Sequence, residues 1–188
     1  MRQKIISAID IRADKVICLI AQELQILDRG KILQLIGIGT SKMPIDCLKP
    51  LSLDKKNITR HVEKAISEAE SESGYKIKNT YVSISENMKS EYIDYEKKIR
   101  EETINEYHIK CFFESSKFKD LYSETEEPLH SFPISYRIDN RRSVSDPIGL
   151  KATTLSVRWH TISTSKNYLH KIHQLFIELD IDLKQIVS

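Results

Sequence analysis

The feature that most constrains the fold is a pair of apolar runs near the amino terminus, joined by a short polar turn. The sequence reads SAIDIRADKVICLIAQEL, with strand-like runs at 5–11 and 16–21 and Arg12, Ala13 and Asp14 between them. Such runs predict a β-hairpin with largely buried strands. A strand that ends in an acidic residue and is followed by a tight turn can also bind a nucleotide phosphate, but such turns normally carry glycine. A nucleotide site, a degenerate site and a plain hairpin all stay open.

The rest of the chain alternates between predicted strands and helices, which indicates a mixed α/β (α+β) fold. Strands are expected at 32–40, 80–85, 132–139, 155–163 and 181–188, and helices at 54–73, 105–116 and 165–180. Gly74 is placed to end the first helix and Asn105 to cap the second. Pro133 favours an edge position for its strand, on which Phe132, Ile134, Tyr136 and Ile138 should share one face. The segments MPIDCLKPLSLD, SETEEP and NRRSVSDPIG are expected to be loops.

Composition excludes several classes of protein. The 188 residues are 40% apolar and 30% charged, with a formal charge of +2, which suits a globular chain with one ordinary core or two small ones. No basic run suggests nucleic-acid binding, and no apolar stretch approaches the roughly 18 residues of a membrane span. We expect Cys18, Cys47 and Cys111 to be buried thiols of a reducing cytoplasm, without a disulfide or a zinc site.

The isolated ionisable residues do not assemble into a catalytic motif. His170 and His173 are spaced for one helix face, but no cysteine or acidic cluster completes a metal site. His160 lacks a nucleophile, so we interpret it as a hydrogen-bonded structural residue. Arg141 and Arg142 lie in the turn-rich segment NRRSVSDP, where they could meet an acidic partner surface or serve solubility alone. We therefore predict no catalytic residue and no metal ligand.

A collinear series of segments resembles the FtsA family of bacterial cell-division proteins, in the actin-like ATPase superfamily. The series comprises AIDIRADKVICLIAQE, LQLIGIGTSKM, ITRHVEKAISEAESESGYKI, TYVSIS, LHSFPISYRIDN, DPIGL, LSVRWHTIS and LHKIHQLFIELDIDLKQIVS. Each segment is short, but their shared order covers essentially the whole chain. A pilus-assembly family with the same layout is the nearest alternative.

The resemblance implies a division of the chain. A partial actin-like (ribonuclease H-type) subdomain would comprise residues 1–79 and 164–188, with an inserted SHS2-type subdomain of strand, helix, strand and strand at 80–163. In the family the insert contacts other FtsA molecules and later division proteins. The implied partner-binding residues here are Arg137, Arg141 and Arg142. The family's second phosphate loop, adenosine loop, FtsZ-binding subdomain and membrane helix have no counterpart, so the chain is expected to be a fragment or a reduced protein.

The resemblance also bears on the opening turn. ATP with magnesium is the family's cofactor, held by glycine and hydroxyl residues in this turn. Asp10 matches the family's metal-water acid and Lys15 its phosphate-facing cation. Arg12 stands where glycine is expected, and Ala13 and Asp14 stand where hydroxyls are expected. A carboxylate there opposes phosphate, whereas an arginine could pair with it. A degenerate site without a cofactor is the expectation.

Three hypotheses about function follow from the resemblance. The first is a non-enzymatic scaffold of the divisome, linked to the FtsZ ring, which would act in the cytoplasm at the inner face of the membrane at the division septum. The second is an actin-like ATPase that binds ATP through Asp10 and Lys15. The third is a truncated remnant without a stable fold. We expect no nucleic-acid partner and no direct insertion into the membrane.

Overall fold

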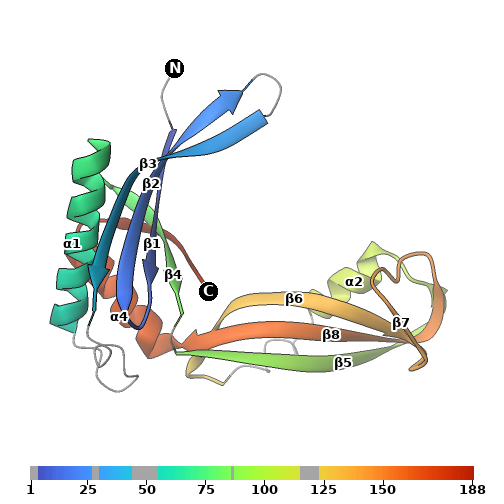
Figure 1. The fold of residues 1–188 in the computed structure, drawn as a ribbon. Helices are drawn as coiled ribbons and strands as arrows, with labels where there is room; N and C mark the ends of the chain where they lie inside the picture. The colour runs from blue at the N-terminus through green and yellow to red at the C-terminus, as the bar shows by residue number, and fades with distance from the viewer. Residues whose placement is uncertain (1–3, 27–29, 44–54, 86, 115–122) are drawn as a thin grey trace. The chain divides into compact units, whose positions relative to one another are not determined.

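A computed structural model describes residues 4–26, 30–43, 55–85, 87–114 and 123–188. The chain divides into two compact units. Unit 1 comprises Met1–Asn87 and Asn167–Ser188, and unit 2, the insert, comprises Met88–Lys166. The predicted loop MPIDCLKPLSLD lies outside the described residues except for Met43. Cys47, within this loop, is also outside them. Figure 1 shows the elements of both units.

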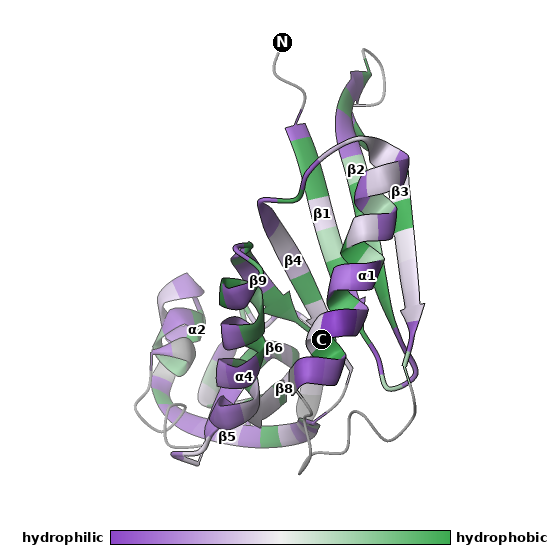
Figure 2. Ribbon diagram, turned by 90° about the vertical axis from the view of Figure 1, so that its left-hand side faces the viewer, coloured by the Kyte–Doolittle hydropathy of each residue, from purple (hydrophilic) through white to green (hydrophobic). Residues whose placement is uncertain are grey.

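Unit 1 is a five-stranded sheet with two helices on one face (Figures 1 and 2). The strand order is β3-β2-β1-β4-β9, with β1, β2 and β3 antiparallel and β4 and β9 parallel to their neighbours. Its elements are β1 (Lys4–Ile11), β2 (Lys15–Ile26), β3 (Gly30–Lys42), α1 (Lys55–Ser73), β4 (Asn79–Ile84), α4 (Lys166–Glu178) and β9 (Asp182–Val187). The opening hairpin is therefore confirmed.

The helices of unit 1 form where the apolar spacing predicts them. Figure 2 shows hydrophilic residues on the outward sides of α1 and α4 and hydrophobic residues along the strands beneath them. Gly74 follows α1 with a positive φ of 72°, as expected of a helix-ending glycine. The shared core contains apolar side chains from the strands and from α1 and α4, namely Ile9, Ile11, Val16, Cys18, Ile20, Ile58, Val62, Ala65, Ala69, Val82, Ile84, Ile172, Leu175 and Phe176.

Unit 2 is a four-stranded antiparallel sheet with order β5-β8-β6-β7. Its elements are β5 (Met88–Thr103), α2 (Glu106–Phe113), β6 (Glu126–Ile138), β7 (Arg142–Val144) and β8 (Lys151–Ser165). Asn105 caps α2 by accepting a hydrogen bond from the His108 amide at 3.2 Å, and Ile104 is buried before it. A second core lies on the helix side, around Ile104, Phe112, Tyr136, Leu155, Val157 and Trp159.

The structure corrects the expected start of the insert at residue 80. Strand β4 pairs in parallel with β1, from Ala8 opposite Tyr81 to Ile11 opposite Ile84. It therefore belongs to the sheet of unit 1, because backbone pairing and not sequence order decides membership of a sheet. The first strand of the insert is β5, which the sequence analysis did not identify. The order strand, helix, strand, strand holds for β5, α2, β6 and β8, with the short β7 added between the last two, but it begins one strand later.

Strand β6 also differs from its prediction. It begins at Glu126, inside the expected SETEEP loop, and its pairing with β8 shifts register between Pro133 and Ser135. An extra residue in one strand reverses the alternation of faces beyond it. Phe132 and Ile134 are consequently exposed while Tyr136 is buried, so the predicted single face is wrong. The short β7 occupies part of the expected NRRSVSDPIG loop and reaches only Tyr136, Arg137 and Ile138 of β6.

Candidate functional site

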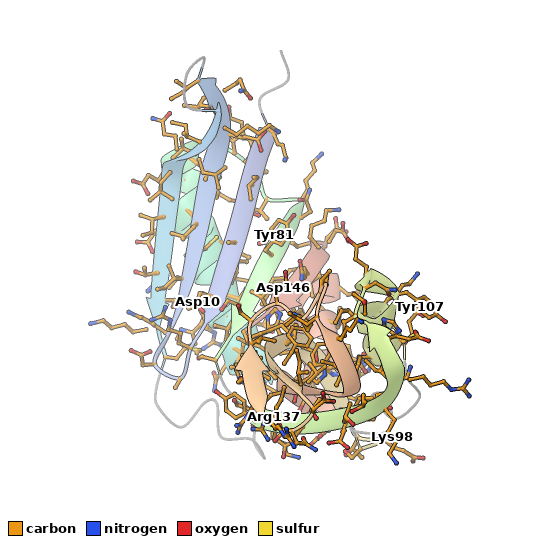
Figure 3. All side chains as sticks on the ribbon, turned by 90° about the vertical axis from the view of Figure 1, so that its right-hand side faces the viewer. Asp10, Tyr81, Lys98, Tyr107, Arg137 and Asp146 are labelled. Carbon is orange, nitrogen blue, oxygen red and sulfur yellow. The ribbon has the colours of Figure 1, made fainter. Side chains whose placement is uncertain are left out.

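The insert presents one sheet face on the side away from α2. Because pairing partners in an antiparallel sheet share a face, the register with β8 gathers a defined set of side chains there. We call this set the open face: Tyr92, Asp94 and Glu96 of β5, Phe132 and Arg137 of β6, and Arg158 and His160 of β8. Figure 3 shows Arg137 and Lys98 on this side of the sheet, whereas Tyr107 and Asp146 lie on the α2 side.

Three aromatic rings form the centre of the open face. Tyr92 stacks on His160 with ring centroids 4.8 Å apart, and Phe132 meets the same imidazole edge-on at 5.1 Å. The His160 ring is held by a 2.8 Å hydrogen bond between its Nε2 and the Ser90 hydroxyl, which confirms the predicted hydrogen-bonded histidine. Tyr92 is 60% exposed and Phe132 43% exposed. Exposed aromatic side chains held in fixed positions are typical of protein-binding surfaces.

A polar hollow of about 250 Å³ adjoins the aromatic cluster. Arg137 and Arg158 line it, together with Asp94 and Glu96. The Arg158 guanidinium lies 5.5 Å from the centre of the Tyr92 ring, and its Nε is 3.9 Å from Oδ1 of Asp94. On the other side, Oε2 of Glu96 accepts hydrogen bonds from Asn140 at 3.1 Å and Ser156 at 3.2 Å. The hollow therefore offers two guanidinium groups among ordered hydrogen-bonding side chains.

The three arginines predicted to bind a partner, Arg137, Arg141 and Arg142, lie in different parts of the insert. Arg137 lines the hollow on the open face. Arg141 is exposed in the β6–β7 turn, where its amide donates to the Ile138 carbonyl at 3.0 Å. Arg142 begins β7 and pairs with Ile138. Tyr92 was not predicted, because strand β5 was overlooked. The alternation in LSVRWHTIS already sets Arg158 and His160 on the face opposite Trp159, and the structure places both on the open face.

The turn after β1 places Asp10, Arg12, Asp14 and Lys15 together at one end of the unit 1 sheet. Nε of Arg12 lies 2.5 Å from Oδ2 of Asp10, as a charge-assisted hydrogen bond. The Arg12 amide donates to the Lys15 carbonyl at 2.9 Å, and the Asp14 carbonyl accepts from the Met43 amide at 2.7 Å. These backbone groups are used within the fold itself.

This arrangement does not fit the magnesium nucleotide that the resemblance implies. A phosphate turn needs backbone N–H groups directed at the phosphates and an acidic residue available to the hydrated metal. Here the Arg12 amide is already bonded, the Asp10 carboxylate is paired with a cation, and Asp14 adds negative charge. The residues of this turn therefore do not form a site for a magnesium nucleotide.

The described part of the chain holds no group of three or more histidine, cysteine or acidic residues arranged to bind a metal. His170 instead contacts Gln174, with Nε2 2.8 Å from the amide nitrogen. Cys18 is buried. Its burial, and to a smaller extent the negative charge of the nearby Glu70, raise the pKa of its thiol to about 12. This cysteine is therefore an unreactive core residue. Among the described helices, none has the length and apolar character that crossing a membrane requires.

The insert matches a known protein domain. Residues 85–163 match the family model of the SHS2 domain inserted in FtsA. The cell division protein FtsA of Buchnera aphidicola from Schizaphis graminum is 27% identical over 191 aligned residues, which cover 98% of this chain, and FtsA of Pseudomonas aeruginosa is 24% identical over 98% of it. The chain is similar to FtsA over almost its whole length.

The chain aligns with less than half of the length of FtsA. The chain spans 43% of the length of each of these two relatives. A solved PilM-PilN type IV pilus biogenesis complex contains a chain that superimposes with a TM-score of 0.63 over 97% of this one and 47% of its own length, at 9% identity. At that identity the likeness shows a shared fold alone. The predicted actin-like subdomain with an SHS2 insert is thus confirmed. The roles of Asp10, Lys15, Arg137, Arg141 and Arg142 stay predictions.

Proposed function

We propose that this chain is a protein-binding module of the bacterial division machinery and that the open face of its SHS2 insert contacts the partner. The observation that carries the proposal is the insert's match to the SHS2 domain of FtsA, together with an ordered aromatic and arginine surface on its uncovered side. Tyrosine and arginine contribute strongly to protein interfaces because they combine apolar area with hydrogen-bonding groups. In this proposal the chain is a scaffold linked to the FtsZ ring.

We propose as its partners other FtsA-like chains and later division proteins, met at the cytoplasmic face of the membrane. Arg137 and Arg158 would pair with carboxylates of a partner, since a guanidinium binds a carboxylate through two parallel hydrogen bonds. Arg141, in the adjacent exposed turn, would extend the basic edge of this surface. No enzymatic step is needed for such a role.

The test is the position of the chain, fused to a fluorescent protein, in dividing bacteria that carry a matched FtsA. We expect a midcell band for the unaltered chain and a diffuse signal for a Tyr92→Ala, Arg137→Glu, Arg158→Glu variant. Arg60→Glu, on the exposed side of α1, is the matched control and should keep the band. A diffuse signal from a folded, intact unaltered fusion would contradict the proposal.

We propose further that the Asp10 turn binds no nucleotide. The support is the Asp10–Arg12 pair at 2.5 Å and the internal use of the Arg12 amide. Calorimetry with magnesium ATP should show no saturable heat for the unaltered chain. Saturable heat that disappears in Asp10→Ala would instead favour the ATPase hypothesis, and saturable heat lost in Arg12→Ala would show that the arginine itself holds phosphate.

A further inference from the structure

A second candidate docking surface lies on the opposite side of the insert, between α2 and the loop that follows β7. We call it the α2 groove, and its volume is about 530 Å³. Its apolar surface comes from Ile109, Tyr136, Pro147 and Ile148. Pockets of this size accept one or two large side chains. Ile148 is 48% exposed, and hydrogen bonds fix the loop that carries it. The loop therefore presents an apolar side chain to solvent in a fixed position.

The hydrogen bonds of the flanking loop preform the groove. The Ile148 amide donates to Oδ1 of Asp146 at 3.0 Å, and the Gly149 amide donates to the Ile104 carbonyl at 2.8 Å. In return the Ile104 amide donates to the Leu150 carbonyl at 2.9 Å, which ties the loop to the residue preceding the α2 cap. Gly149 supplies the left-handed conformation, with φ of 83°. A wall fixed in this way loses little conformational freedom when a ligand binds.

The rim of the groove is acidic. Glu106, Glu114 and Asp146 face one basic residue, Lys110, whose Nζ lies 3.5 Å from Oε1 of Glu114. The rim therefore carries an excess of negative charge. Burial raises the pKa of the Tyr136 phenol in the groove, and the negative charge of Asp146 raises it further. Such a potential attracts cationic groups and repels acidic ones.

We propose that the α2 groove binds a short segment of a partner polypeptide that inserts a large apolar side chain between Ile109 and Ile148 and places lysine or arginine against Glu106 and Asp146. This inference rests on the proposed function, because it gives the insert a second docking surface with different chemistry from the open face. The open face combines aromatic rings with two guanidinium groups and two carboxylates, whereas the α2 groove suits basic segments with an apolar anchor.

The experiment is a nuclear magnetic resonance titration of the whole chain with a short amidated peptide that carries a Leu-Phe pair between lysines. We expect saturable shifts centred on the amides of Ile109, Tyr136 and Ile148. Ile148→Ser should weaken binding by about tenfold, as expected when one large apolar contact is lost. A peptide with serines in place of Leu-Phe should bind more weakly, and one with glutamates in place of the lysines should not bind.

Charge reversal sharpens the test. Glu106→Lys with Glu114→Lys leaves the Asp146–Ile148 hydrogen bond intact. This double variant should abolish binding of the lysine peptide and create binding of the glutamate peptide, whereas Tyr92→Ala on the open face should change neither. The inference is overturned if the unaltered chain shows no saturable shift, or if the shifts persist unchanged in Ile148→Ser. If the peptide fails while the fluorescent fusion still reaches midcell, only the groove is excluded. If the peptide binds but no fusion reaches midcell, the division role fails and the groove remains.

Discussion

Two glycines in β3 set how closely α1 approaches the sheet of unit 1. A Cβ built on Gly39 would lie 1.9 Å from the Ala65 carbonyl oxygen and 2.7 Å from the Ala69 amide nitrogen, and one on Gly37 would lie 2.4 Å from the Ala69 carbonyl oxygen. These atoms belong to the helix backbone, so they cannot move aside as a flexible side chain would. The helix therefore packs against β3 at a distance that only glycine permits, as the sequence pattern LQLIGIGT suggests.

Replacing Gly39 with alanine should consequently separate α1 from the sheet. We expect the free energy of unfolding to fall by about 3 kcal/mol, the upper range for overpacking a core, because the clash is with backbone. Chemical denaturation monitored by circular dichroism measures it. Gln34→Ala, on an exposed site of the same strand, is the control and should stay within about 0.5 kcal/mol of the parent. A Gly39→Ala chain as stable as this control would contradict the close approach.

Asp139 fixes the turn between β6 and β7. It adopts a φ of 47°, and its Oδ1 accepts hydrogen bonds from the Thr153 amide at 2.8 Å, the Thr153 hydroxyl at 2.6 Å and the Thr154 amide at 2.8 Å. The hydrogen bond from the Thr153 side chain, followed by those from the two amides, lowers the pKa of the Asp139 carboxyl. The charged form is therefore favoured in the folded state.

The lowered pKa predicts an acid-sensitive contribution to stability. Since the folded pKa lies below the unfolded value of about 3.9, the contribution is complete above that value and is lost as pH falls through the folded pKa. Asp139→Asn keeps the side-chain shape but removes the charge. We expect it to be less stable than the parent in urea at neutral pH and to approach the parent at strongly acidic pH. A stability difference that is independent of pH would contradict this reasoning.

At the scale of elements, α1 also protects the outer edge of β3. Strand β3 is the first in the sheet order, so one row of its backbone groups faces away from β2. The Ile38 amide donates to Oε2 of Glu72 and the Thr40 amide donates to Oε2 of Glu68, each at 2.7 Å. Edge amides left unpaired invite association with other strands. The carboxylates of α1 satisfy these two amides without another strand.

The double variant Glu68→Ala, Glu72→Ala should expose this edge. We expect hydrogen exchange at the Ile38 and Thr40 amides to accelerate by about tenfold or more, because each amide loses a charged acceptor worth about 1.5 kcal/mol or more. The Val82 amide, in an inner strand, should exchange at the parental rate. Equal rates at Ile38 and Thr40 in both proteins would show that the carboxylates do not hold the edge.

The prediction of elements from the sequence succeeded where apolar residues form a long stripe or run and failed where charged residues interrupt the apolar pattern. Helix α1 carries a continuous apolar stripe, and the hairpin strands are apolar runs. Strand β5 reads MKSEYIDYEKKIREET, in which charged residues dominate because it is an edge strand with one face in solvent. Its few inward residues, such as Ile93 and Ile99, give too weak an alternation. Missing β5 also moved the expected insert boundary onto β4.

The candidate site was harder to predict than the fold, for a related reason. The open face draws single residues from three strands, so its composition depends on pairing register. Arg137 was already among the partner-binding residues that the resemblance implies. Tyr92, opposite His160, and Arg158, opposite Asp94, become neighbours only through the β5–β8 pairing. Local sequence also could not reveal that Arg12 would pair with Asp10, which requires the geometry of the turn.

At the scale of the whole molecule, the insert begins and ends at one place in its own sheet. Met88 at the start of β5 is the pairing partner of Thr164 near the end of β8. Paired residues in an antiparallel sheet lie about 4.5–5.5 Å apart, so the insert can be added or removed with little change in the distance that the chain must span. Each unit also has its own buried core, around Ile9 and Val82 in unit 1 and Trp159 in unit 2.

Separate cores and adjacent ends predict that each unit folds without the other. A chain in which residues 88–166 are replaced by a Gly-Ser linker of roughly four residues, long enough for about 13 Å, should unfold cooperatively. Residues 88–166 alone should do the same. Amide spectra of the two pieces should overlay on that of the whole chain, except near the junctions. Non-cooperative melting of both pieces and of the whole chain would favour the remnant hypothesis, because a decayed sequence would lack the packed cores on which both docking surfaces depend.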